Sequence, residues 1–412
     1  MTRPLSARIA LVVLFLGVAA PVAAGPFEDG AIAAKTGNYA MAMRLWLPLA
    51  EQGLVSAQLN LAIMYDNGQG LPRNDVAAAT WYRKAADQGY AKAQSNLGFM
   101  YLSGRGVPQA FVEAVKWYRK AADQGDAAAQ YELGVLYDNG QGVPRDDAAA
   151  AAWFRKAADQ DHAEAQSNLG FMYFTGRGVP QDFAEAVKWY RKAAERGNAA
   201  ALYNLGLLYL KGEGGRPNYA AVASLFRKAA DRGNADAQFN LGYMYAEGQG
   251  IRRDQVAGAR WYRKAADQGR ANAQFNLALL YQNGKGVPRD YGTAATWFRK
   301  AADQGHVDAQ LNLGIMYSNG QGVPQDHAAA ESWYQKAANH GDAGAKVEGA
   351  PLGDGSAPTW LNLTAIGGDK AAARSGDLPL HASPKRKSRR YRPAQKGKVV
   401  ARPSVASADE GN

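Results

Sequence analysis

Cysteine is absent from all 412 residues of the chain. Its absence excludes disulfide bonds, thiolate catalysis, thiolate metal sites and lipid attachment at an N-terminal cysteine. The sequence also lacks a Gly-x-Ser-x-Gly elbow, a Ser-x-x-Lys pair, a His-Glu-x-x-His helix and a phosphate loop ending in Gly-Lys-Ser/Thr. Packing alone must therefore hold the fold, and we expect neither enzymatic activity nor a cofactor.

Histidine is scarce as well, with five in the chain. No two of them have a spacing that would place two metal ligands on one helical face, so we expect no metal site.

A Gly-x-Gly recurs along the chain, but it follows predicted helices rather than strands. That context is not typical of a nucleotide-binding loop.

Long apolar runs are limited to one, which extends over the 12 residues from Ile9 to Ala20. Arg3 and Arg8 precede it and small residues end it, which is the pattern of a secretory signal. The run is shorter than the ~20 residues that a membrane-spanning helix needs. We predict a signal peptide over residues 1–24 that is cleaved after Ala24, and a periplasmic or secreted mature protein without a transmembrane span.

The rest of the chain is organised around a glycine that returns every 36 residues. The positions are Gly53, Gly89, Gly125, Gly197, Gly233, Gly269, Gly305 and Gly341, with Asp161 in the one slot that differs. Residues 54–341 are thus eight copies of one unit, and a period of this length is typical of a solenoid.

Each copy predicts two helices. In the first helix, a leucine (Leu61 to Leu313) and a tyrosine four residues later (Tyr65 to Tyr317) lie on one face. The residue after the leucine is Gly in six copies and Ala in two. Because Gly inside a helix costs about 1 kcal/mol relative to Ala, this slot predicts a close backbone approach between helices.

The second helix follows a loop whose commonest form is Asn-Gly-Gln-Gly-Val-Pro-Arg-Asp. Asn or Asp precedes the helix in every copy except at Ala110, and such residues cap the first turn. Asp182 and Glu185 predict a capping box. Trp occurs in seven copies, and we expect it to pack opposite small Ala and Gly residues. The following Arg-Lys pair is expected to extend into water.

These residues resemble the Sel-one-like repeat, a relative of the tetratricopeptide repeat. The matching motifs are Ala-Gln-x-Asn-Leu-Gly-x-Met-Tyr, the Gly-x-Gly-Val-Pro-x-Asp loop and Trp-Tyr-Arg-Lys-Ala-Ala. The resemblance implies an all-α fold, a right-handed αα-hairpin solenoid with a concave binding face. It also implies that the protein is an adaptor in protein complexes. Bacterial members of the family include exported regulators of signalling, of cell-surface polysaccharide and of envelope assembly.

The two ends depart from the repeat. Residues 25–53 predict an atypical N-terminal helical cap, and the composition of residues 342–412 predicts a disordered tail. Within the tail, residues 381–402 hold four Lys, five Arg and no acid. One interpretation is a solvated tail, and the other is contact with anionic lipid or polysaccharide rather than specific nucleic acid. The candidate contacts are Lys385, Arg386, Lys387, Arg389, Arg390 and Arg392.

A candidate partner site lies between the Gln and Asn of the first helix, where the residue varies among copies. Large rings occur at Tyr131, Tyr203, Phe239 and Phe275, and the apolar slot four residues on, from Ile63 to Ile315, is a candidate wall beneath them. The rings predict either a partner-binding groove anchored by aromatics or core filler between helices.

The sequence as a whole favours an exported protein-interaction scaffold that regulates or assembles a cell-envelope complex. The alternative is an envelope protein that binds polysaccharide or an anionic surface, and a cell-wall hydrolase is the least favoured class. Neither the partner protein nor the oligomeric state follows from the sequence.

Overall fold

The computed structural model describes residues 25–212 and 218–340, and within these residues it contains eighteen helices and no strand. The predicted signal peptide and the predicted basic tail, with its six candidate contacts, lie outside the described residues. A search of the described helices for a membrane-spanning segment, by length and hydropathy, finds no candidate. The described chain divides into two compact units, with the division at Lys120 and Ala121 inside α6.

The first unit begins with the helical cap and contains the first two repeats. Its helices are α1 (Pro26–Lys35), α2 (Tyr39–Glu51), α3 (Val55–Asn67), α4 (Asp75–Asp87), α5 (Ala91–Ser103) and the part of α6 (Phe111–Asp123) up to Lys120.

The second unit contains repeats 3 to 8. Its helices are α7 (Ala127–Asn139), α8 (Asp147–Asp159), α9 (Ala163–Thr175), α10 (Phe183–Glu195), α11 (Ala199–Lys211), α12 (Tyr219–Asp231), α13 (Ala235–Glu247), α14 (Gln255–Asp267), α15 (Ala271–Asn283), α16 (Tyr291–Ala302), α17 (Val307–Asn319) and α18 (His327–His340).

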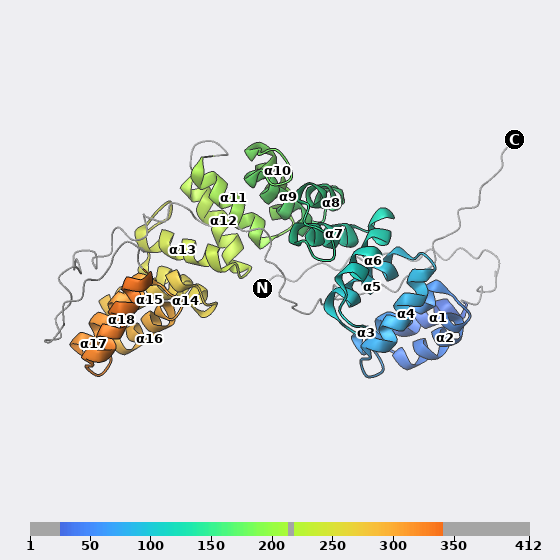
Figure 1. The fold of residues 1–412 in the computed structure, drawn as a ribbon, viewed down its shortest axis with the longest axis horizontal. Coiled ribbons are helices and arrows are strands. Elements are labelled where there is room, and N and C mark those ends of the chain that lie inside the picture. Colours follow the sequence, from blue (N-terminus) through green and yellow to red (C-terminus); the bar gives the residue numbers. More distant parts are fainter. Residues whose placement is uncertain (1–24, 213–217, 341–412) are drawn as a thin grey trace, which may run out of the picture. The chain divides into compact units, whose positions relative to one another are not determined.

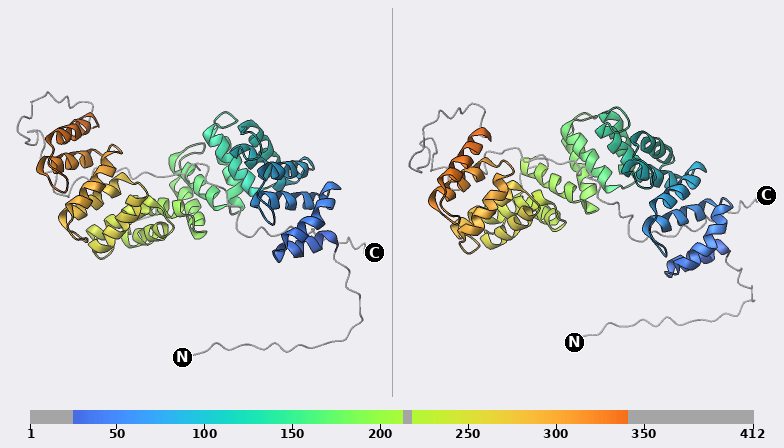
Figure 2. Two further views of the ribbon diagram at one scale, coloured as in Figure 1. Left: turned by 90° about the horizontal axis from the view of Figure 1, so that it is seen from below. Right: turned by 60° about the horizontal axis from the view of Figure 1, so that its bottom comes forward.

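From α3 on, odd-numbered helices are the first helix of a repeat and even-numbered helices are the second, which we call odd helices and even helices. From α1 to α5 in the first unit and from α7 to α18 in the second, each helix packs mainly against its neighbours in chain order. Figures 1 and 2 show this order within the second unit, where each ribbon lies beside the next. The result is an αα-hairpin solenoid.

Both glycines of the Gly-x-Gly loop have structural roles. In repeat 4, Gly176 has φ 72° and ends α9 in the left-handed conformation, which Gly adopts without strain. Gly178 has φ 68°, and a Cβ there would overlap the carbonyl oxygen of Asp147 at the start of α8. The second glycine therefore lets the loop of one repeat lie against the backbone of the preceding repeat.

The glycine inside the odd helices makes room for an aromatic ring. A Cβ on Gly134 would lie 2.7 Å from the ring of Phe154, and the equivalent glycines of other repeats meet the equivalent Tyr or Phe. We expected a close approach of two backbones and a Trp opposite the small residues. The first expectation was wrong, because the ring after the Trp fills the space at the glycine. The Trp packs elsewhere, as at Trp189, which is 2% exposed and lies in one buried cluster with Ala157 and Ala158, whereas Trp153 is half-buried.

A buried glutamine joins consecutive repeats. Gln130 donates from Nε2 to the carbonyl oxygen of Ala122 (3.1 Å), at the end of the preceding even helix. Its own Oε1 accepts from Gln160 (2.7 Å). The last carbonyls of a helix have no partner inside that helix, so this side chain satisfies one of them across the repeat boundary.

The predicted capping box of α10 is half formed. The Asp182 side chain accepts from the backbone N–H of Glu185 (3.0 Å), as expected. The Glu185 side chain does not complete the box, because the backbone N–H of Asp182 already donates to the carbonyl oxygen of Tyr173 (2.9 Å). Glu185 instead accepts from Lys188 (2.7 Å) and from the indole N–H of Trp189 (3.0 Å).

The last even helix differs from the others on the face that a next repeat would cover. The slot that holds buried Ala or Val in most earlier repeats, such as Ala151 and Ala295, holds an exposed Glu331 in α18. Four residues on, Gln335 replaces the arginine of the earlier repeats and donates to Glu331 (3.4 Å). The end of the array is therefore polar where the preceding interfaces are apolar.

Candidate functional site

The four predicted anchor rings lie at the contact between an odd helix and the even helix that follows it. Each ring packs against the aromatic ring of that even helix, with centroids 5.5 to 5.8 Å apart; the pairs are Tyr131–Phe154, Tyr203–Phe226, Phe239–Tyr262 and Phe275–Phe298. Tyr203 is 1% exposed and Phe275 is 8% exposed, whereas Tyr131 and Phe239 are half-buried.

Further contacts hold these rings in place. The Tyr203 hydroxyl accepts from Nδ2 of Asn240 (3.2 Å) in the next repeat, and burial raises the pKa of this hydroxyl above its usual range. Phe275 stacks on His306 with centroids 4.6 Å apart. This packing supports the core interpretation for Tyr203 and Phe275, while contact of Tyr131 and Phe239 with a partner stays a proposal.

The slot four residues after the anchor rings in the odd helices is more exposed than the slot that holds the rings. It holds half-buried apolar side chains in all the repeats of the second unit except repeat 5, where Leu207 is 1% exposed; the half-buried members are Val135, Phe171, Tyr243, Leu279 and Ile315. We call these five residues the apolar row. The sequence placed this slot beneath the anchor rings, whereas the structure exposes it more.

Charged residues flank the apolar row on the same helical face. Glu164, Asp236 and Asp308 lie seven residues before a member of the row, and Glu247 lies four residues after Tyr243. Residues at these spacings share one side of a helix. We call the row together with its flanking positions the odd-helix face.

The odd helices of the second unit are acidic. They carry one lysine, Lys211, and six carboxylates, which are Glu132, Asp138, Glu164, Asp236, Glu247 and Asp308. The even helices of the same unit carry thirteen Lys and Arg and seven Asp and Glu. The two sets of helices therefore differ in the sign of their net charge.

The cations of the even helices lie on aromatic rings. Lys156 places its Nζ 3.9 Å from the centroid of the Trp153 ring, and the same pairing recurs in the six other repeats that have the Trp. Arg191 donates to the hydroxyl of Tyr209 (2.9 Å) in the next repeat. The predicted Arg-Lys pair thus contributes to packing within and between repeats.

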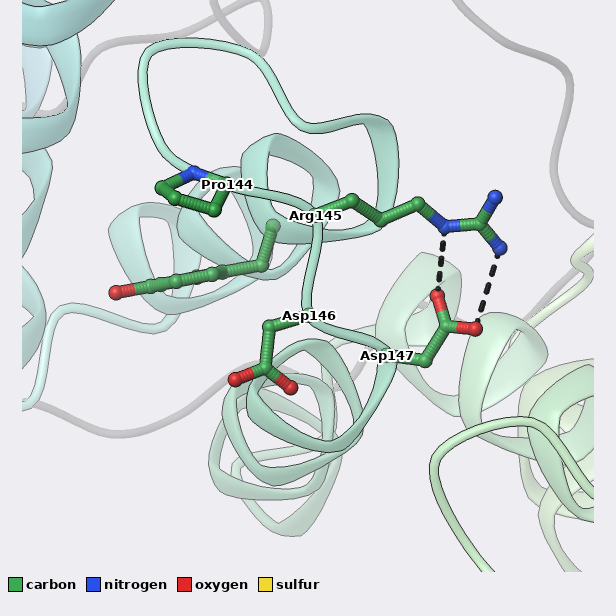
Figure 3. A pocket seen from close by; sticks show the side chains of 5 residues that line it. Pro144, Arg145, Asp146 and Asp147 are labelled. Carbon is green, nitrogen blue, oxygen red and sulfur yellow. Dashed lines mark hydrogen bonds and ion pairs between the residues drawn. The ribbon is translucent and has the colours of Figure 1, made fainter.

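A hollow on the surface of repeat 3 is lined by Tyr137, Pro144, Arg145, Asp146 and Asp147 (Figure 3). Its charged groups already have partners. Arg145 donates to both carboxylate oxygens of Asp147 (3.0 and 3.2 Å), and Asp146 caps α8. Asp147 also pairs with Arg177 (2.9 Å), and its hydrogen bonds from Arg177 and Arg145 lower the pKa of the carboxyl to about 2. We therefore assign no binding role to this hollow.

No group of three or more His, Asp or Glu side chains in residues 25–212 and 218–340 is placed to hold a metal ion. The two histidines at repeat junctions act as helix caps. His162 and His306 each accept at Nδ1 from the backbone N–H three residues on (3.3 Å). Burial lowers the pKa of His306, which favours the neutral ring that this cap requires.

Sequence reasoning missed the acidic odd-helix face. The signal was present, because the charged slots recur at the spacing of the apolar row and mark the side that faces water. The prediction relied instead on the slot that varies among copies, which contains the rings. Variation among copies does not by itself distinguish an exposed site from a core position that adapts to its neighbours.

The Sel1 repeat model matches eight consecutive stretches of the chain: residues 55–90, 91–126, 127–162, 163–198, 199–234, 235–269, 271–306 and 307–342. No curated protein matches the chain significantly.

Two solved structures are similar in both sequence and fold. A Sel1 repeat protein from Oxalobacter formigenes has 32% sequence identity and a TM-score of 0.58, over 81% of this chain and 96% of that one. The protein c5321, described as a protective antigen present in uropathogenic Escherichia coli strains and displaying an SLR fold, has 33% identity and a TM-score of 0.53, over 76% of each chain.

Proposed function

Because the chain belongs to the Sel1 repeat family, we propose that it is an exported scaffold that binds another protein through its odd-helix face and helps to regulate or assemble a cell-envelope complex. Sel1 repeats generally mediate contacts between proteins. The observation that carries the proposal is the apolar row, whose members remain half-buried while the rings beneath them are packed against the even helices.

Export is a separate part of the proposal and rests on residues 1–24. Their basic start, short apolar run and small residues before Gly25 support a cleaved signal. Sequencing the N-terminus of the mature protein should give Gly25 as the first residue. Recovery of the intact Met1 terminus in a membrane fraction would contradict export by cleavage.

The partner site is tested with Tyr243→Ser and Leu279→Ser together. Both side chains are half-buried and also pack against a buried cluster, so circular dichroism and melting are measured first to establish that the double variant is folded. A partner that rests on the row then loses its apolar contacts. Cross-linking in the native cells should trap the partner with the wild-type chain and at least tenfold less with the double variant.

The matched control is Val256→Ser, since Val256 is an exposed apolar residue at the start of an even helix. This change should leave partner capture intact. Equal capture by the wild-type chain and the double variant, with unchanged melting of both, would remove the odd-helix face as the binding site.

A second function is contact with an anionic surface, and the composition of residues 381–402 supports it. Each Lys or Arg of a polybasic segment near an acidic lipid surface contributes about 1 kcal/mol to the free energy of binding. Sedimentation with vesicles that contain acidic lipid should fall when the candidate cations Lys385, Arg386, Lys387, Arg389, Arg390 and Arg392 are changed to Gln. Undiminished sedimentation would exclude this function for them.

A further inference from the structure

We infer that the odd-helix face of repeats 6 to 8 binds basic peptide segments, and that its resident occupant is residues 381–402 of the same chain. The inference deepens the proposed function, on which it rests for the use of this face as a peptide-binding surface. The ligand of the face is then a basic peptide, and residues 381–402 occupy the face before a partner protein binds.

The face offers both kinds of contact that such a segment needs. Tyr243, Leu279 and Ile315 provide a half-buried apolar row over three consecutive repeats. Glu247 and Asp308 flank that row, and neither forms an ion pair with another described residue. Asp236 also lies on this face but is already paired with Arg270.

Charge separates this face from the even helices. The even helices of the second unit carry an excess of Lys and Arg, so a cationic segment is repelled there and attracted to the odd helices. Residues 381–402 carry nine cations and no acid, interleaved with Tyr391, Val399 and Val400. Their composition therefore matches an acidic surface with an apolar centre.

The length of the chain permits the contact within one molecule. The last described helix, α18, ends at His340 in repeat 8, so about 40 residues connect it to the basic segment. At no more than about 3.5 Å per residue, that connection spans up to ~140 Å. Tethering also makes the contact intramolecular, so it needs no second chain to supply the segment.

A tethered occupant of this kind changes what a partner must do. A partner protein has to displace the basic segment, and an anionic membrane or polysaccharide that takes up the segment would free the face. Because the attraction is largely electrostatic, added salt weakens it over a Debye length of about 8 Å at physiological ionic strength.

The absence of native cysteine allows a direct test in the full chain. A single Ser388→Cys residue is labelled with a benzophenone photo-cross-linker, and the cross-linked peptides are identified by mass spectrometry. At low salt we expect cross-links to α13, α15 and α17, with at least a fivefold loss in 0.5 M NaCl. Cross-links scattered over the even helices, or products that contain two chains at low protein concentration, would overturn the inference.

Charge reversal on the face gives the matched comparison. Glu247→Lys with Asp308→Lys should reduce the cross-links at least fivefold, whereas Asp267→Lys with Asp303→Lys, which changes two exposed carboxylates outside the odd helices, should not. Equal cross-linking of both double variants would overturn the inference.

Failure of the inference is distinct from failure of the proposed function. If cross-links are scattered while Tyr243→Ser with Leu279→Ser still abolishes partner capture, the partner site stands and its resident occupant is wrong. If the cross-links map to the face while that variant captures the partner normally, the occupant stands and the partner binds elsewhere.

Discussion

The joint between repeats 3 and 4 differs from the joint between repeats 5 and 6, although the backbone pattern is the same. At the first joint, Arg177 pairs with Asp138 (2.5 Å) and with Asp147 (2.9 Å). At the second joint, the equivalent positions hold Gln249, Leu210 and Tyr219, so no such ion pair forms there.

The second joint is apolar where the first is ionic. Leu210 and Ile251 pack against the buried cluster that contains Val222 and Phe226. Both joints nevertheless keep the loop glycine against the preceding even helix, at Gly178 and at Gly250. The comparison teaches that the glycines and the aromatic core set the geometry of a joint, while the loop side chains decide whether salt and acid affect it.

The largest expected effect is a loss of stability when the buried aromatic ring that both joints share is removed. Phe154→Ala and Phe226→Ala each remove a ring that is 1% exposed, and each should lower the free energy of unfolding by about 3–5 kcal/mol. Because repeats contact mainly their neighbours, hydrogen exchange should rise most in α7–α10 for the first variant and in α11–α14 for the second. A cost below 1 kcal/mol at one joint would show that the cores are not equivalent.

A smaller effect should distinguish the joints. Arg177→Gln copies the residue of the apolar joint and should cost about 1–2 kcal/mol, because it removes two partly exposed charge-assisted pairs and leaves two carboxylates near each other. The reverse change, Gln249→Arg, should add no stability, since Leu210 and Tyr219 offer no carboxylate. Denaturation in low and high salt measures both, and the cost of Arg177→Gln should shrink in 1 M NaCl.

The smallest effect is the pH dependence. The pKa of Asp147 is lowered in the folded chain from 3.8 to about 2, chiefly by its hydrogen bonds from Arg177 and Arg145. The ionised carboxylate therefore stabilises the fold above pH 4, and this contribution is lost as the pH falls through about 2. The difference in melting temperature between the wild-type chain and Arg177→Gln should become smaller as the pH is lowered from 5 to 2. A constant difference would contradict the assignment of the stabilisation to Asp147.

Much of the architecture follows from the sequence. The 36-residue spacing, the Asn and Asp caps and the glycine after each odd helix predicted the αα-hairpins, and the Sel1 repeat match confirms the family and the solenoid. These features are local, because a cap or a left-handed glycine acts within one turn of its own residue.

The contacts between repeats were harder to predict. Nothing in the spacing indicated that Gln130 would reach Ala122 or that Arg177 would reach Asp138, because these pairs depend on how successive hairpins stack. The same limit applies to the site. The sequence proposed Tyr203 as an anchor, yet its depth is set by Phe226 and Asn240, which come from other helices.

The polar end of α18 bears on how many units can associate. Each interior interface joins one face of a repeat to a different face of the next, and such heterologous contacts continue indefinitely unless something stops them. Glu331 and Gln335 occupy the slots that would receive the next unit, where an incoming chain would have to bury a carboxylate. We therefore expect the pair to oppose filament growth, and light scattering of Glu331→Ala with Gln335→Arg should reveal more concentration-dependent head-to-tail assembly than the wild-type protein shows.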